Sequence, residues 1–68
     1  MRAKEIRFII TDRRKELSLK QEDLAEMAGV TIRTLYMIES GKGNPSVSTL
    51  EKIMVVLGLD LNIRIKHR

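Results

Sequence analysis

Apolar residues in the first quarter of the chain recur with the period of a helix. Within residues 3–17, Ile6, Ile10 and Leu17 fall on one face, because residues four and seven apart lie above one another on a helix. Three basic residues follow at 13–15, where cations favour a helix C-terminus. We therefore predict a first helix over residues 3–17 that packs this stripe inward.

A second, shorter helix is predicted over residues 21–28. Leu24 shares a face with Met27 and with Ala28, and Gly29 follows directly. Glycine is common just after a helix because it adopts the left-handed backbone conformation without strain. The pattern therefore predicts two helical turns that end at Gly29.

A third helix is predicted to begin after Thr31, a good N-cap, with Leu35 and Ile38 facing inward. The glycine- and proline-containing stretch 41–45 ends it. Ser46 then caps a fourth helix that Gly58 closes, and its apolar positions follow the three-and-four spacing: Val47, Leu50, Ile53, Met54 and Leu57. Ser48 with Glu51 forms a competing capping box.

After Gly58 the period changes from that of a helix to that of a strand. Four apolar residues alternate strictly with polar ones: Leu59, Leu61, Ile63 and Ile65. This pattern predicts a half-buried strand over residues 59–66. Because the chain offers no second strand, we expect the segment to pair with its copy in a homodimer. A frayed tail lying on the helices is the alternative.

Length and composition limit the class of protein. Sixty-eight residues make one small domain, which we divide into a helical region, 1–58, and a dimerisation strand and tail, 59–68. The apolar share is 43% but the aromatic share only 3%, so the core must be aliphatic. The chain has no cysteine, which excludes disulfides and thiolate metal sites and fits a reducing compartment. With no long apolar run either, we expect a cytoplasmic protein without a membrane partner.

The charge favours an anionic partner but is unevenly distributed. Thirteen basic residues against nine acidic ones give a net charge of +4, as is common in proteins that bind nucleic acid. Residues 21–40, however, carry a net −3, which opposes the approach of phosphates. We expect three acidic residues of the second helix to point away from a duplex: Glu22, Asp23 and Glu26.

Residues 19–42 contain two short predicted helices joined by a tight turn at Gly29, with small Ala25 allowing close approach of the helices. Over residues 5–58 the sequence resembles the XRE family of phage Cro- and repressor-type proteins. The matching positions are Gln21, Leu24, Ala25, Gly29, Leu35, Ile38, Glu39, Gly41, Asn44, Pro45 and Ser46. The resemblance implies a mainly α, four-to-five-helix lambda-repressor-like domain whose third helix enters the major groove of double-stranded DNA. With its C-terminal strand, the chain is most similar to small Hip-type antitoxin repressors, which bind a kinase-like toxin.

The resemblance also implies which residues face DNA. Ile32, Arg33 and Met37 match positions that face base edges, and the guanidinium of Arg33 can pair bidentately with guanine. Ile32 and Met37 are equally compatible with the core. Six residues are proposed to contact the DNA backbone, and each can also be an ordinary surface residue: Lys20, Gln21, Thr34, Tyr36, Lys42 and Asn44. Thr31, the predicted cap of the third helix, is also placed in the DNA-binding set.

Two further residues match a structural pair of the family. Arg14 and Glu39 correspond to a salt bridge that joins the first helix to the third, so we expect them to orient the helix and not to read bases. Lys20 stands where the family usually has Ser or Thr, which weakens the cap of the second helix.

Catalysis finds no support in the sequence. The sole histidine, His67, is next to last, and no glycine-rich loop precedes a helix. We therefore expect a non-enzyme without a cofactor.

The expected function is that of a sequence-specific transcriptional repressor, which acts as a homodimer on a near-palindromic operator. The same protein can also be the antitoxin of a toxin–antitoxin pair. The alternative is a protein-interaction module that binds a toxin or kinase and has no significant DNA binding. RNA binding ranks third, because aromatic residues for base stacking are scarce.

Overall fold

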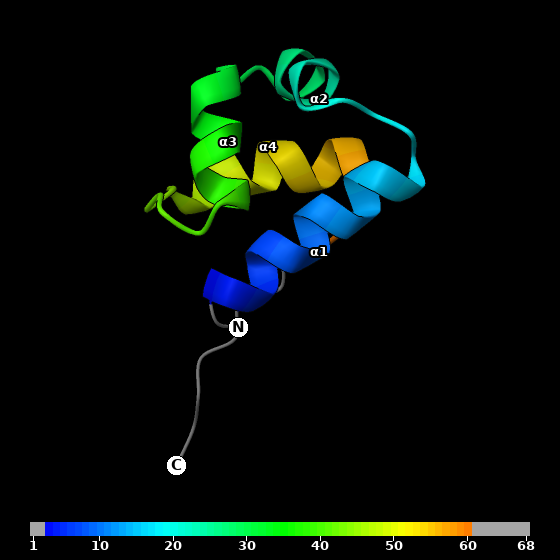
Figure 1. Cartoon of the computed structure of the whole chain (residues 1–68). Helices are drawn as coiled ribbons and strands as arrows, with labels where there is room; N and C mark the ends of the chain where they lie inside the picture. Colours follow the sequence, from blue (N-terminus) through cyan, green and yellow to red (C-terminus); the bar gives the residue numbers. More distant parts are fainter. Residues whose placement is uncertain (1–2, 61–68) are drawn as a thin grey trace.

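The computed structural model describes residues 3–60 (Figure 1). Within this part the chain forms four helices and no strand. They are α1 (Ala3–Glu16), α2 (Gln21–Ala28), α3 (Ile32–Glu39) and α4 (Val47–Leu57). The described part is therefore mainly helical, as the periodicity predicts, and none of its helices is long and apolar enough to cross a membrane.

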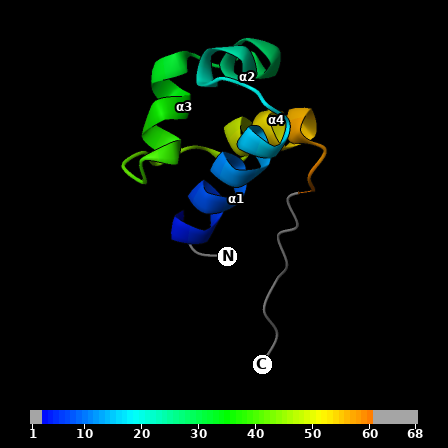
Figure 2. The same cartoon turned by 45° about the vertical axis from the view of Figure 1, so that its right-hand side comes forward.

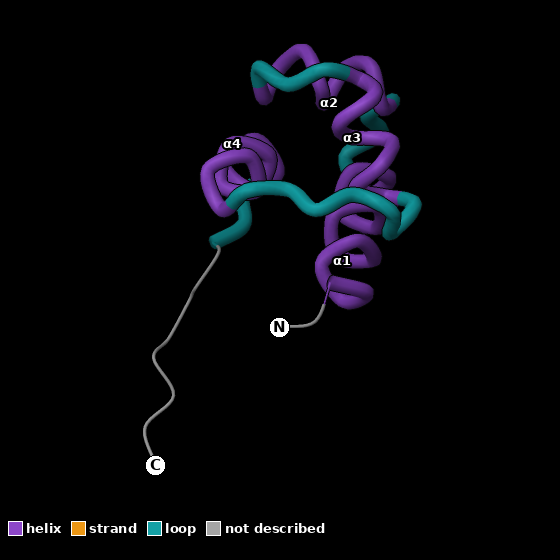
Figure 3. Tube along the Cα trace, turned by 90° about the vertical axis from the view of Figure 1, so that its left-hand side faces the viewer, coloured by secondary structure: helices purple, strands orange, loops and turns teal. Residues whose placement is uncertain are grey.

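The four helices pack around a common centre. In Figures 1 and 2, α4 lies between α2 above and α1 below, and α3 stands at one end of α4. Figure 3 views the same arrangement nearly along α4, with the loop between α3 and α4 crossing in front. Contacts between elements join α2 to both α3 and α4, and α1 to both α3 and α4. Of the two short helices, α2 is thus supported by α4 and α3 by α1.

The core is entirely aliphatic apart from one methionine. Every helix contributes at least one fully buried side chain, and α4 contributes two: Ile10, Leu24, Leu35, Ile53 and Leu57. Full burial of such a side chain stabilises a fold by about 1.5–3 kcal/mol. The core therefore depends on contributions from all four helices.

The helix boundaries follow from turn and cap chemistry. Gly29 and Gly58 end α2 and α4 with φ of 72° and 70°, values that favour glycine. The hydroxyl oxygens of Thr31 and Ser46 each accept a hydrogen bond of 3.1 Å from the backbone N–H three residues on. Ser46 is thus the cap of α4, and the competing capping box that begins at Ser48 is wrong.

The start of α2 uses a different device. Lys20 occupies the N-cap position without a side-chain cap hydrogen bond, since an ammonium cannot accept one. Instead, the backbone N–H of Lys20 donates to Asp23 Oδ2 at 3.0 Å. This contact is the half of a capping box that does not need a Ser or Thr, and it was not predicted from the sequence.

Three residues predicted to face inward are exposed. Leu17 is 40%, Met27 61% and Val47 45% exposed. Leu17 lies beyond the end of α1, where Ser18, with φ of 57°, turns the chain away. Met27 and Val47 lie in the last turn of α2 and the first turn of α4, in which the side chains of Ala28 and Leu50 are buried. The periodicity identified the helices but placed these three residues on the wrong side.

The chain after α4 is described only as far as Asp60. The backbone N–H of Leu59 donates to the carbonyl of Met54 at 2.9 Å, and its partly buried side chain packs against the core. The other apolar residues of the predicted strand, Leu61, Ile63 and Ile65, lie outside the described residues.

Candidate nucleic-acid interface

The helix α3 has one buried and one exposed face. Leu35 is fully buried and Ile38 is 5% exposed, whereas Ile32 and Tyr36 are 51% and 54% exposed. Arg33 is exposed on the same outer side. Ile32 is therefore not a core residue, and α3 presents a guanidinium, a phenol and an aliphatic side chain to solvent.

Hydrogen bonds occupy some polar groups on this helix. The hydroxyl oxygen of Thr31 accepts from the backbone N–H of Thr34, and the Thr31 hydroxyl also donates to Thr34 Oγ1 at 2.9 Å. Met37 is half-buried, and a Cβ on Gly43 would lie 3.3 Å from the Met37 Cβ. Met37 thus sits at the margin between the exposed face and the following loop.

Three side chains from three helices meet at the C-terminal end of α3, and we call Arg14, Gln21 and Glu39 the Glu39 cluster. Arg14 Nε donates to Glu39 Oε2 at 2.8 Å, and Arg14 Nη2 donates to Oε1 at 2.9 Å. Gln21 Nε2 donates to the same Oε1 at 3.2 Å. The side chains of Arg14 and Glu39 are only 11% and 6% exposed. Such a bidentate, charge-assisted pair has a narrow geometric optimum, so it sets the orientation of α3 relative to α1 and α2.

The Glu39 cluster keeps both charges ionised. Burial raises the pKa of Glu39, but hydrogen bonds from Arg14, Gln21 and Thr11, together with the charge of Arg14, bring the pKa below its ordinary value. The hydrogen bond to Glu39 raises the pKa of Arg14 against the effect of desolvation. One of the four acids of residues 21–40 is therefore paired within the protein. The other three are exposed on α2: Glu22, Asp23 and Glu26.

The Glu39 cluster also brings candidate phosphate contacts together. Because Gln21 bonds to Glu39, the start of α2, with exposed Lys20, lies beside the end of α3. The loop with exposed Lys42 begins at this same end. Two of the predicted cations thus flank one end of the exposed face.

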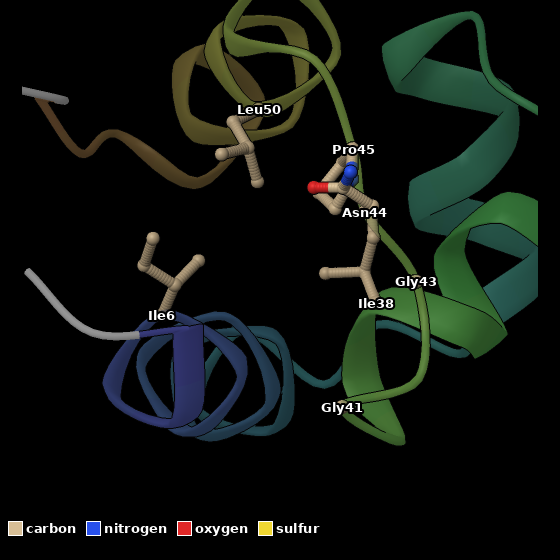
Figure 4. Close-up of a pocket in the computed structure, with 7 residues that line it drawn as sticks. All are labelled: Ile6, Ile38, Gly41, Gly43, Asn44, Pro45 and Leu50. Carbon is tan, nitrogen blue, oxygen red and sulfur yellow. The ribbon is translucent and has the colours of Figure 1, made fainter.

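The α3–α4 loop also borders a pocket of about 220 Å³ (Figure 4). Its lining consists of Ile6, Ile38, Gly41, Gly43, Asn44, Pro45 and Leu50. Asn44 is exposed, and its side chain turns toward the pocket, although Asn44 also borders a second hollow beside Arg33 and Thr34. The lining offers no carboxylate, imidazole or hydroxyl side chain for chemistry. Among the residues that the structure describes, no cluster of three or more histidine, cysteine or acidic side chains suits a metal ion.

A further polar contact that was not predicted from the sequence joins α1 to the end of α3. Arg7 Nη1 donates to the backbone carbonyl of Ser40, just after α3, at 3.2 Å. The available signal was spacing, because Arg7 and Arg14 are seven residues apart and share a face of α1. Both arginines reach α3 from that face.

Comparisons with known proteins agree with this geometry. A sequence model described as Helix-turn-helix matches residues 10–63. The chain is 40% identical over 60 residues to the ImmF control region 10 kDa protein of Bacillus phage phi105, covering 88% of this chain and 67% of the relative. It is 43% identical over 53 residues to an HTH-type transcriptional regulator of Methanothermobacter thermautotrophicus, covering 78% and 77%.

A third relative is longer. The chain is 36% identical over 53 residues to the HTH-type transcriptional regulator PuuR of Escherichia coli, of which it covers only 29%. The shared region therefore centres on the helices described above. From the family match and the extent of the first two relatives, the chain belongs to the XRE-type helix-turn-helix family.

Proposed function

We propose that this protein is a sequence-specific, double-stranded DNA-binding transcriptional repressor without catalytic activity. The observation that carries the proposal is the exposed face of α3, which the Glu39 cluster holds in a defined orientation. Relatives named as HTH-type transcriptional regulators support it. In this function α3 lies in the major groove, whose donor and acceptor pattern distinguishes all four base pairs.

Base reading falls mainly to Arg33. Its exposed guanidinium can donate two parallel hydrogen bonds to O6 and N7 of guanine. Ile32, half exposed one residue earlier, can contact a thymine methyl group. Half-buried Met37 reaches only the margin of the groove, so we assign it apolar contact of lesser weight.

Phosphate contacts position the helix. Gln21 uses one amide hydrogen on Glu39 and has a second for a phosphate oxygen. The phenol of Tyr36 and the ammonium groups of Lys20 and Lys42 are exposed donors. The remaining proposed contacts are Thr31, Thr34 and Asn44. Because such contacts carry no sequence information, they set affinity and register.

Substitution of Arg33 tests the proposal. We expect Arg33→Ala to cost about 1–3 kcal/mol of affinity for the operator and to relax discrimination at one base pair per half-site. Footprinting on the promoter of its own gene locates the site, and titrations with operator and scrambled duplexes measure the change. An equal loss on both duplexes would show that Arg33 contacts only phosphate.

We also propose that the protein acts as a homodimer, with residues 59–68 as the dimerisation segment of a 1–58 domain. Two copies related by a two-fold axis would read half-sites whose centres lie about 34 Å apart, or a multiple of that, so the operator would be near-palindromic. Sedimentation equilibrium of Ile63→Asp, with Asn62→Asp as the control on the alternate face, tests the segment. A dimer that survives Ile63→Asp would refute this role.

A second candidate function is binding of a protein partner such as a kinase-like toxin, with this chain as the antitoxin. A shallow hollow between α2 and α4 favours it, in which Met27 is 61% and Val55 75% exposed. Its polar lining residues are Ser48, Glu51 and Lys52. Exposed apolar side chains with polar neighbours are typical of interaction sites. The salt dependence of duplex binding separates the two functions, because a pure interaction module would lack the steep dependence that phosphate contacts produce.

A further inference from the structure

Two arginines on α1 bond to backbone carbonyls at the ends of two other helices. Arg7 Nη1 donates to Ser40 O, which directly follows α3, at 3.2 Å. Arg13 Nε donates to Leu57 O, the last residue of α4, at 2.9 Å. A cation at a helix C-terminus satisfies carbonyls that lack partners and interacts favourably with the helix dipole. The two arginines therefore make the same kind of contact at the C-terminal ends of α3 and α4, but only the end of α3 leads into the loop with Lys42.

The surroundings of Arg7 fix its side chain closely. Gly41 has φ of 77°, and a Cβ at this position would lie 3.0 Å from Arg7 Cδ and from Nη1. The guanidinium thus lies directly against the backbone of the loop. On another side, Arg7 Cζ is 4.6 Å from the centre of the Phe8 ring, a distance typical of a cation–π contact. Arg7 Nε is buried without a hydrogen-bond partner. Burial of such a donor is unfavourable, so the other contacts of the side chain must offset its desolvation.

Arg7 is in contact with the residue that precedes Lys42. The backbone N–H groups of Lys42 and Gly43 both donate to the carbonyl of Met37, at 3.0 and 3.1 Å, so the first turn of the loop folds back on α3. The Arg7 side chain covers this turn at Ser40 and Gly41. We propose that Arg7 is a positioning residue for DNA binding, which holds the loop after α3 so that Lys42 meets a phosphate. This inference rests on the proposed DNA-binding function.

The test compares Arg7→Met with Arg13→Met, which removes the equivalent bond at the end of α4. We expect Arg7→Met to bind operator and scrambled duplexes about tenfold more weakly, with a salt slope that is shallower by about one per site. Arg13→Met should lower the melting temperature but leave affinity within about twofold of wild type and the salt slope unchanged. Circular dichroism confirms that each variant is folded at the temperature of the titration.

Lys42→Ala reveals whether Arg7 acts through Lys42. If it does, the variant with both Arg7→Met and Lys42→Ala binds no more weakly than Lys42→Ala alone, because coupled residues are not additive. Additive losses would overturn the inference.

Arg7→Lys supplies a folded variant that keeps the charge without the planar guanidinium. We expect it to bind about as weakly as Arg7→Met, and recovery of wild-type affinity would overturn the inference by showing that charge alone is sufficient. If wild-type protein binds duplex DNA but Arg7→Met binds equally well, the positioning role fails and the proposed function stands. If wild-type protein shows no salt-dependent binding, both fail.

Discussion

The helices α3 and α4 are held in place by different kinds of interaction. Four side chains of α4 are buried: Leu50, Ile53, Met54 and Leu57. Only two apolar side chains of α3, Leu35 and Ile38, are buried. Both helices receive an arginine contact at their ends, Arg7 on Ser40 and Arg13 on Leu57, but α3 also carries the Glu39 cluster. One helix is fixed mainly by apolar burial and the other largely by polar contacts.

The difference suits the role proposed for each helix. Apolar burial is strong but non-directional, and it is sufficient for an element that only has to complete the core. A bidentate ion pair has a narrow geometric optimum, so it limits how α3 can rotate or slide. Base reading requires such precision, because a recognition side chain that shifts by an ångström loses its hydrogen bonds.

The largest expected effect comes from breaking the Glu39 cluster. Glu39→Ala leaves Arg14 buried and without its ion-pair partner, which should destabilise the protein by about 3–5 kcal/mol. Thermal melts of Glu39→Ala, Arg14→Ala and the double variant measure the coupling. If the two single losses simply add, the residues do not stabilise each other and the contrast between α3 and α4 is wrong.

The corresponding change in α4 is Ile53→Ala. Because Ile53 is fully buried, its truncation should cost about 2–5 kcal/mol. Val55→Ala, at a position that is 75% exposed, is the control and should change stability by less than about 0.5 kcal/mol. Duplex binding by folded Ile53→Ala should match wild type, whereas a loss of sequence discrimination would mean that α4 packing also orients α3.

Acid should weaken the polar contacts selectively. The pKa of Glu39 is lower in the folded protein than its ordinary value, so its ionised form favours folding. This contribution is complete above the unfolded pKa of about 4.3 and is lost as the pH falls through the lower folded pKa. In urea denaturation, the stability difference between wild type and Glu39→Gln should therefore shrink from pH 7 to about pH 3. The difference between wild type and Ile53→Ala should stay constant over the same range.

The smallest effect concerns the helix caps, in which the two helices are alike. Thr31 and Ser46 accept equivalent hydrogen bonds of 3.1 Å, so Thr31→Ala and Ser46→Ala should each cost about 1 kcal/mol. Chemical denaturation of both variants provides the measurement. A much larger loss of stability for Thr31→Ala than for Ser46→Ala would show that the start of α3 depends on polar contacts beyond the cap hydrogen bond.

The sequence predicted the helices because their ends are determined locally. Gly29 and Gly58 adopt the backbone conformation that glycine favours, and Thr31 and Ser46 cap the helices that follow them. These signals act within a few residues of the chain. Burial is less local, which is why Met27 was assigned to the core although it is 61% exposed.

The polar contacts could not be derived from local patterns. Arg14 and Glu39 are 25 residues apart and Arg7 and Ser40 are 33 apart, so their pairing depends on the tertiary arrangement. Only the resemblance to the XRE family suggested the first pair, and the spacing of Arg7 and Arg14 along α1 was the one signal for the second. The exposure of Ile32 likewise depended on how α3 packs, since its spacing from Leu35 is compatible with either face.

The separation of the two faces of α3 has a consequence for how such a protein can change its target. The side chains of Ile32, Arg33 and Tyr36 make no hydrogen bond or ion pair within the described part of the chain and lie outside the core. Substitutions there are therefore decoupled from the residues that fold and orient the helix. In evolution or in design, this surface can be exchanged as a unit, so that new operator preferences arise on an unchanged scaffold.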